Sequence, residues 1–165
     1  MKYTINYFRE FFQSKDNWCE GTPLDKDGNS CAVGHFGVRY REKIKICSPT
    51  LTVKELIEMG GNRRALSALG KIFAPIFKNK PKIKCFDRIF VINDGNWRDN
   101  VSYQDFFNDK NTSDNWELIG PKERLLIALD YCEKVYRDLG VLDIIGVPTK
   151  VEDKVVVEKE VLCMT

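Results

Sequence analysis

Long apolar runs, a strong excess of one charge and closely spaced cysteine pairs are all missing from this chain of 165 residues. Without a run of about 18 apolar residues, the sequence predicts no transmembrane helix and no membrane partner. The opening MKYTINYFREFF lacks the basic and then apolar pattern of a secretory signal, so we expect a cytoplasmic location. The net charge is only +2, with acids and bases interleaved, so composition requires neither a nucleic acid nor an anionic surface.

The cysteines are scattered, at positions 19, 31, 47, 85, 132 and 163. No pair has the two-to-four-residue spacing typical of structural zinc sites, and a small secreted disulfide framework would need a different context. We therefore expect reduced cysteines that pack mostly as small apolar residues, with no metal and no other cofactor.

Helical periodicity dominates the pattern. Residues 4–14 place Ile5, Phe8 and Phe12 on one stripe, and residues 62–77 form a second amphipathic segment that Pro75 should end or kink. Shorter helices are predicted near 52–59 and within 102–107.

The clearest predicted helix covers residues 121–139, with Pro121 at its first position and Gly140 just after its end. Its predicted core face is formed by Leu125, Leu129, Cys132, Tyr136 and Leu139.

The predicted β-structure is small. Residues 86–92, FDRIFVI, are rich in aromatic and β-branched residues and precede an NDG turn, which favours a strand. The turn chemistry of Asp25, Asp27 and Gly28 predicts a hairpin or tight loop. The sequence therefore predicts an α+β fold: an α-rich single domain over 1–140 with a small β-sheet or hairpin, followed by an extended arm over 141–165.

The stretch CAVGHFG supplies the candidate catalytic residues. Cys31 and His35 are four residues apart and would share one helical face, with Ser30 as the N-cap, and Asp94 could orient the histidine. A cysteine at a helix start would also have a lowered pKa. The alternative is that Cys31 is an inert buried cysteine and His35 lies at the edge of the core; we favour no catalytic residue.

Two further groups of residues are weaker candidates for a binding site. Cys19, Cys31, His35 and Cys47 have the residue types of a zinc site, but their wide spacing argues against one. The basic stretch 78–84 carries Lys78, Lys80, Lys82 and Lys84 after two phenylalanines, a pattern that could bind nucleic acid or could be a solvated loop.

Several short motifs together resemble an uncharacterised domain family of bacteria and their phages, which has no assigned activity. The resemblance covers about residues 4–135. Its motifs are Trp-x-x-Gly, Asp-x-x-Gly, Cys-small-Leu-Gly and a hydrophobic segment ending in Asn-Asp. They correspond here to Trp18 and Gly21, Asp25 and Gly28, Cys31 and Gly34, and Asn93 and Asp94.

The resemblance implies that Trp18, Gly21, Cys31, Gly34, Asn93 and Asp94 form one cluster. His35 departs from the family pattern, where a small or aliphatic residue is usual, so a mechanism that depends on it loses support.

Three functions follow as hypotheses. The first is a non-enzymatic accessory protein that acts through protein–protein contacts, as a virion component or a host-interaction factor. The second is a cysteine-dependent hydrolase or transferase centred on Cys31, and the third is nucleic-acid binding by the basic stretch. The valine-rich segment 147–165 is expected to be an assembly arm, because KVVVEKEVL favours an extended strand that could pair with a partner or a second copy.

Overall fold

The computed structural model describes residues 3–37, 61–78, 82–95, 116 and 118–140. Its elements are α1 (Ile5–Gln13), α2 (Ala32–Gly37), α4 (Arg63–Ile72), the 3-10 helix η2 (Ala74–Phe77), α5 (Cys85–Asp94) and α7 (Pro121–Asp138). The helices expected near 52–59 and within 102–107, and the arm over 141–165, lie outside the described residues.

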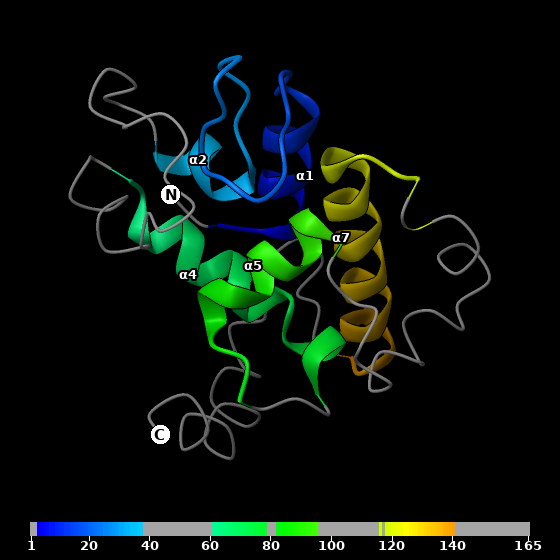
Figure 1. The fold of residues 1–165 in the computed structure, drawn as a ribbon. Coiled ribbons are helices and arrows are strands. Elements are labelled where there is room, and N and C mark those ends of the chain that lie inside the picture. The colour runs from blue at the N-terminus through cyan, green and yellow to red at the C-terminus, as the bar shows by residue number, and fades with distance from the viewer. Residues whose placement is uncertain (1–2, 38–60, 79–81, 96–115, 117, 141–165) are drawn as a thin grey trace.

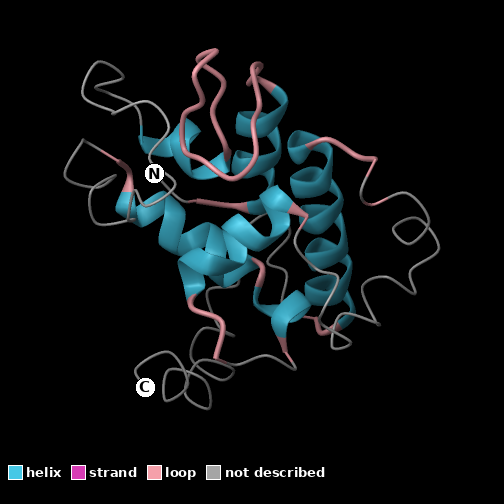
Figure 2. Cartoon of the chain, in the orientation of Figure 1, coloured by secondary structure: helices cyan, strands magenta, loops and turns pink. Residues whose placement is uncertain are grey.

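The predicted strand over 86–92 is wrong, because these residues belong to helix α5. Its buried side chains Ile89, Ile92 and Asn93 recur at helical spacing, and α5 packs between α4 and α7. Figure 2 shows helices and loops but no strand in the described part of the chain. Helices make up 62% of that part, so the predicted α+β class with a small sheet or hairpin is corrected to a helical one.

Helices α1 and α7 form where the periodicity predicts them. Ile5, Phe8 and Phe12 are buried in α1, which Thr4 caps by accepting the Tyr7 N–H at 3.0 Å. On α7 the predicted inner face is buried at Leu125, Leu129 and Cys132. Leu139 is an exception: it lies just after the last turn and is 62% exposed, so the prediction that it belongs to the core is wrong.

Pro75 divides the segment 62–77 as expected. Asn62 caps α4 by accepting the Ala65 N–H at 3.0 Å. The α-helix stops at Ile72, and Pro75 then occupies the first turn of η2, where its missing N–H costs nothing.

The helices share one hydrophobic core. Figure 1 shows α5 between α4 and α7, with α1 and α2 at one end of the molecule, and contacts join α5 to α2, α4 and α7. Aromatic rings fill the α1–α2 side: the Phe11 and Phe36 rings stack with centroids 4.1 Å apart, and the Phe8 and Phe36 rings form a T-shaped pair with centroids 5.6 Å apart. The loop that precedes α2 lies against the C-terminal end of α5.

Candidate functional site

A structured loop over residues 14–31 carries most of the predicted cluster. Asp25 holds its turn, because one carboxylate oxygen accepts the backbone N–H groups of Asp27 at 2.9 Å and Asn29 at 2.8 Å. The two sides of the loop meet in isolated bridges from Ser30 to Trp18 and to Leu24. The loop is therefore tight, as expected, and it contains bridges but no hairpin strands among its described residues.

Asn93, in the last turn of α5, joins this loop to α2. Its side chain is fully buried; Oδ1 accepts the Ala32 N–H at 2.9 Å, and Nδ2 donates to the Cys19 carbonyl at 3.1 Å. The first N–H of a helix has no partner within that helix, so Asn93 supplies the acceptor that α2 lacks. The loop and the NDG turn, which are far apart in sequence, thus meet in space.

Asp94 lies beside Asn93 and is partly exposed. Its Oδ1 accepts the Gly21 N–H at 3.0 Å and the Asn93 Nδ2 at 2.8 Å. These hydrogen bonds hold a loop amide in place. The suggested role of Asp94 in orienting the histidine gains no support from this geometry.

Sequence reasoning missed Arg124, which completes the same cluster. This arginine of the first turn of α7 is only 2% exposed; its Nη2 donates to the Asn93 carbonyl at 2.7 Å and pairs with the Glu20 carboxylate. Its position four residues before the buried Ala128 was the available signal, because a helix brings such residues onto one face. Arg124 therefore links α7 to both α5 and the loop.

Cys31 immediately precedes α2, where the nearby backbone N–H groups of Gly34 and Val33 act to lower the pKa of its thiol. Burial raises the pKa of the Cys31 thiol from 9.0 to about 12, although those N–H groups act in the opposite direction. Burial dominates because the side chain is 1% exposed. The pKa of the thiol is thus shifted in the opposite direction from the one that the catalytic alternative requires.

Ser30, predicted as the N-cap of α2, does not cap it. Its hydroxyl is buried and finds no hydrogen-bond partner among the described residues. At this helix start the Ala32 N–H donates to Asn93 Oδ1 instead. The prediction fails because the helix begins one residue later than the sequence indicates, which leaves Ser30 two positions before it.

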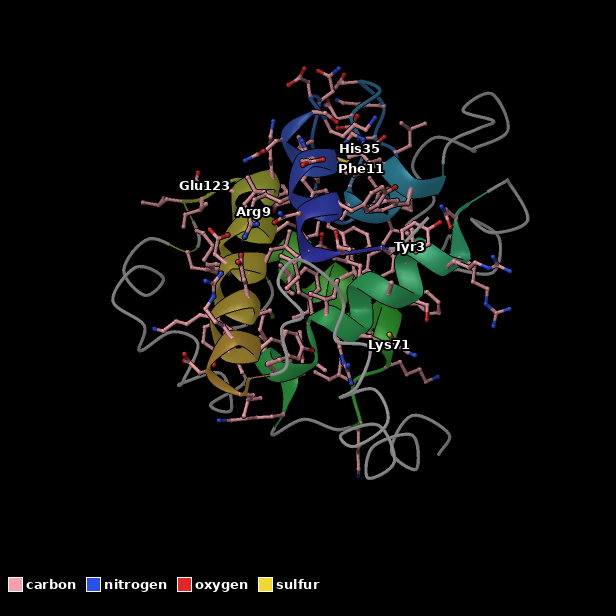
Figure 3. The ribbon with its side chains drawn as sticks, turned by 180° about the vertical axis from the view of Figure 1, so that it is seen from behind. Tyr3, Arg9, Phe11, His35, Lys71 and Glu123 are labelled. Atoms are coloured by element: carbon pink, nitrogen blue, oxygen red, sulfur yellow. The ribbon has the colours of Figure 1, made fainter. Side chains whose placement is uncertain are left out.

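His35 and Trp18 lie together on the outer side of α2. Their ring centroids are 4.4 Å apart, and the Trp18 indole N–H donates to the Lys15 carbonyl at 3.0 Å. Figure 3 shows His35 at the α1–α2 end of the molecule. The histidine ring is thus placed against the Trp18 ring.

Gly34 allows the loop to lie directly on α2. A Cβ atom at this position would stand 1.9 Å from the Pro23 carbonyl oxygen, far inside van der Waals contact. Only a residue without a side chain therefore allows this contact between the loop and the helix.

The described residues contain no group of three or more histidine, cysteine or acidic side chains arranged to hold a metal ion. Cys47 of the hypothetical zinc set lies outside the described residues. Burial, with the negative charge of Asp25 as the next cause, also raises the pKa of Cys19 to about 11.

Three of the four lysines in the basic stretch can be located. Lys78, Lys82 and Lys84 are exposed, after η2 and before α5, and Lys80 lies outside the described residues. Lys84 stands at the start of α5, at the opposite end of that helix from Asn93.

Comparison with protein-family models, with curated proteins and with solved structures found no match. Among the described helices, none is long and apolar enough to span a membrane.

Proposed function

We propose that this chain is a non-enzymatic accessory protein of bacterial or phage origin that acts through protein–protein contacts. The origin rests on the resemblance of Trp18, Gly21, Cys31, Gly34, Asn93 and Asp94 to the bacterial and phage family. A cytoplasmic location in the host cell, or a place in the virion, is part of the same proposal.

The observation that carries the proposal is the state of Cys31. The most reactive residue type in the cluster is 1% exposed, and its pKa is raised by burial to about 12. A nucleophilic cysteine needs a thiolate that a substrate can reach. Cys31 satisfies neither condition. The cluster therefore favours a structural role, in which it holds the loop in place, over a catalytic role.

The segment 147–165 is the proposed contact arm. Its sequence KVVVEKEVL combines β-branched residues with charges, which suits an extended segment that completes a partner's sheet or pairs with a second copy. Three consecutive valines also make a freely solvated tail unfavourable.

Truncation after Gly146 tests this proposal. The shortened chain should fold with the same circular-dichroism spectrum and lose its association, as measured by light scattering and by capture of partners from the native host. A matched variant, Val155→Asp with Val157→Asp in the full chain, should lose association equally. The proposal would be contradicted if both variants kept the oligomeric state and the partners of the full chain.

A further inference from the structure

The stretch from Gly61 to Lys84 is an exception to the interleaved charges of this chain, because it carries positive charge only. It contains no aspartate or glutamate, although the whole chain has 24 acidic residues. Its basic residues are Arg63, Arg64, Lys71, Lys78, Lys80, Lys82 and Lys84. Because the net charge of the chain is only +2, this stretch leaves the remainder of the chain net negative. Such a separation of charge along a sequence indicates an anionic partner.

The structure exposes this charge. Every basic residue of the stretch is exposed to solvent except Lys80, which lies outside the described residues. The last turn of α4 lies against the first turn of α5, since a Cβ atom on Gly70 would stand 2.0 Å from the Cys85 carbonyl oxygen. Lys71 follows Gly70 and Lys84 precedes Cys85 in the sequence. The basic residues at the end of α4 and those before α5 therefore lie close together.

Helix α4 presents cations along its outer face. Arg64, Ala68 and Lys71 follow one another at spacings of four and three residues, which places them on the same side of the helix. Arg64 and Lys71 are exposed, and they lie about 10 Å apart along the helix axis, since each residue adds about 1.5 Å. Figure 3 shows Lys71 on the α4 side of the molecule, away from Arg9 and Glu123. An extended anionic ligand can thus follow α4 from one charge to the other.

We call the exposed cations of α4 and those before α5 the basic face: Arg63, Arg64, Lys71, Lys82 and Lys84. Arg9 of α1 and Arg137 of α7 are paired with acids, at 2.6 Å from Asp130 and from Glu133. In the part of the chain that the structure describes, no ion pair is formed by four members of the basic face: Arg63, Arg64, Lys82 and Lys84. The repulsion among these charges is therefore not balanced by described acids, and a polyanion would balance it.

The distribution of apolar side chains favours one class of polyanion. A membrane-binding surface inserts large apolar side chains, and a protein interface is usually centred on buried aromatic or apolar anchors. Among the described residues, the exposed large hydrophobic side chains are Leu118 and Leu139, before and after α7, and neither belongs to the basic face. A nucleic acid needs no such anchor, because its phosphates bind spaced lysine and arginine side chains. The basic face thus fits a nucleic acid better than a membrane or an acidic protein.

We propose that the basic face binds a nucleic acid through its phosphate backbone. Arg63 and Arg64 contribute planar groups that can each hold two phosphate oxygens, and the lysines contribute flexible point charges. The sequence hypothesis used only the lysines of residues 78–84, and α4 now adds three cations that lie outside that stretch. This binding goes beyond the protein contacts proposed for segment 147–165, and either can fail without the other.

Fluorescence anisotropy of labelled DNA, titrated with the full chain at several salt concentrations, tests the basic face. Duplex DNA and oligothymidylate should both bind, and their affinity should fall as salt rises, because binding releases counterions. Arg64→Gln with Lys71→Gln should make the slope of log affinity against log salt shallower by about 2 for duplex DNA, since each lost phosphate contact removes about 0.9. Lys82→Gln with Lys84→Gln, on the other part of the face, should have the same effect. Circular dichroism checks that both variants fold.

A matched control separates the basic face from the net charge of the protein. Lys26→Gln with Lys134→Gln removes the same charge from two exposed positions, in the loop turn and on α7, and should leave the slope unchanged. If the control lowers the affinity and the slope as much as the two basic-face variants do, DNA is attracted by net charge alone and the proposal is overturned. Absence of DNA binding by the unmodified chain at low salt overturns it as well.

Two competitors distinguish a nucleic acid from the other anionic partners. Unlabelled oligothymidylate should displace the labelled DNA far better than polyglutamate of equal total charge, and better than vesicles of phosphatidylserine and phosphatidylcholine. Equal displacement by polyglutamate would assign the basic face to an acidic protein segment, and equal displacement by the vesicles would assign it to a membrane surface. Either of these results contradicts the nucleic-acid assignment.

Discussion

Asn93 Oδ1 accepts the Ala32 N–H at 2.9 Å, so a side chain at the end of α5 satisfies the start of α2, 61 residues earlier. The same amide group donates to the Cys19 carbonyl at 3.1 Å. This one buried residue of α5 therefore contacts both the loop and the short helix α2. A helix of six residues is not stable alone, and this contact helps to explain how α2 forms.

Removing the Asn93 side chain should destabilise the fold. Asn93→Ala leaves the Ala32 N–H and the Cys19 carbonyl without these partners, and we expect a loss of about 3 kcal/mol in the free energy of unfolding. Urea unfolding followed by circular dichroism measures it. Gln13→Ala, on an exposed side chain, is the control and should change stability by less than about 0.5 kcal/mol. An Asn93→Ala midpoint close to that of the control would show that the capping contact is dispensable.

Asp94 should matter less, because its side chain is partly exposed. Asp94→Ala removes the acceptor of the Gly21 N–H, and we expect a loss of about 1 kcal/mol. Asp94→Asn keeps an oxygen acceptor at the same position and should lose less. If Asp94→Ala unfolds at the wild-type midpoint, the residue has no structural role, and a functional one becomes the better explanation.

The meeting of Gly21, Asn93 and Asp94 is implied by the family resemblance and not by any local pattern, and the helix that carries two of these residues is not predicted. The segment FDRIFVI predicts a strand because its β-branched and aromatic residues fit a pleated surface. Contacts with α4 and α7, which a sequence window does not contain, bury Ile89 and Ile92 on one helical face and override that propensity.

The burial of two arginines is also not predicted from the sequence. Arg88 and Arg124 are both buried, although arginine is normally placed at the surface. Their partners are carbonyl groups and a loop carboxylate from distant parts of the chain. No local pattern reveals such partners, although the helical spacing of Arg124 to Ala128 indicates on which face of α7 Arg124 lies.

Cys31 should not react in the folded protein. With a pKa of about 12, its thiolate is a negligible fraction of the thiol at neutral pH, and burial also blocks access. Iodoacetamide at pH 7.5, followed by peptide mass spectrometry, should label Cys31 only after unfolding in urea. Rapid labelling of the native protein would restore the cysteine-enzyme hypothesis.

The same raised pKa predicts how stability depends on pH. The unfolded chain loses the Cys31 proton near pH 9.0 and the folded chain only near 12, so the unfolded state binds fewer protons between these values. Stability from this group is therefore complete below pH 9 and falls by about 1.4 kcal/mol per pH unit above it. The stability difference between wild type and Cys31→Ala should shift by that amount in favour of the variant between pH 9.5 and 10.5. A difference independent of pH would show that the thiol titrates normally.

Gly34 and Gly120 form a matched pair for testing the close contact between the loop and α2. In Gly34→Ala the new methyl group would stand 1.9 Å from the Pro23 carbonyl oxygen, so the loop must move away from the helix. We expect a loss of about 3 kcal/mol, the upper end of the usual cost of overpacking. Gly120, the N-cap of α7, has φ −70, and a Cβ atom added there would meet no described atom within 4 Å, so Gly120→Ala should cost no more than about 1 kcal/mol, the loss of a favourable N-cap residue.

Urea unfolding of both variants, with the slope as well as the midpoint, measures the difference. Movement of the loop should also weaken the Asn93 contacts, because the loop and α2 share them. The double variant Gly34→Ala with Asn93→Ala should therefore lose less stability than the two single losses added together. Full additivity would mean that the loop shifts without disturbing the end of α5, and that the two contacts stabilise the fold independently.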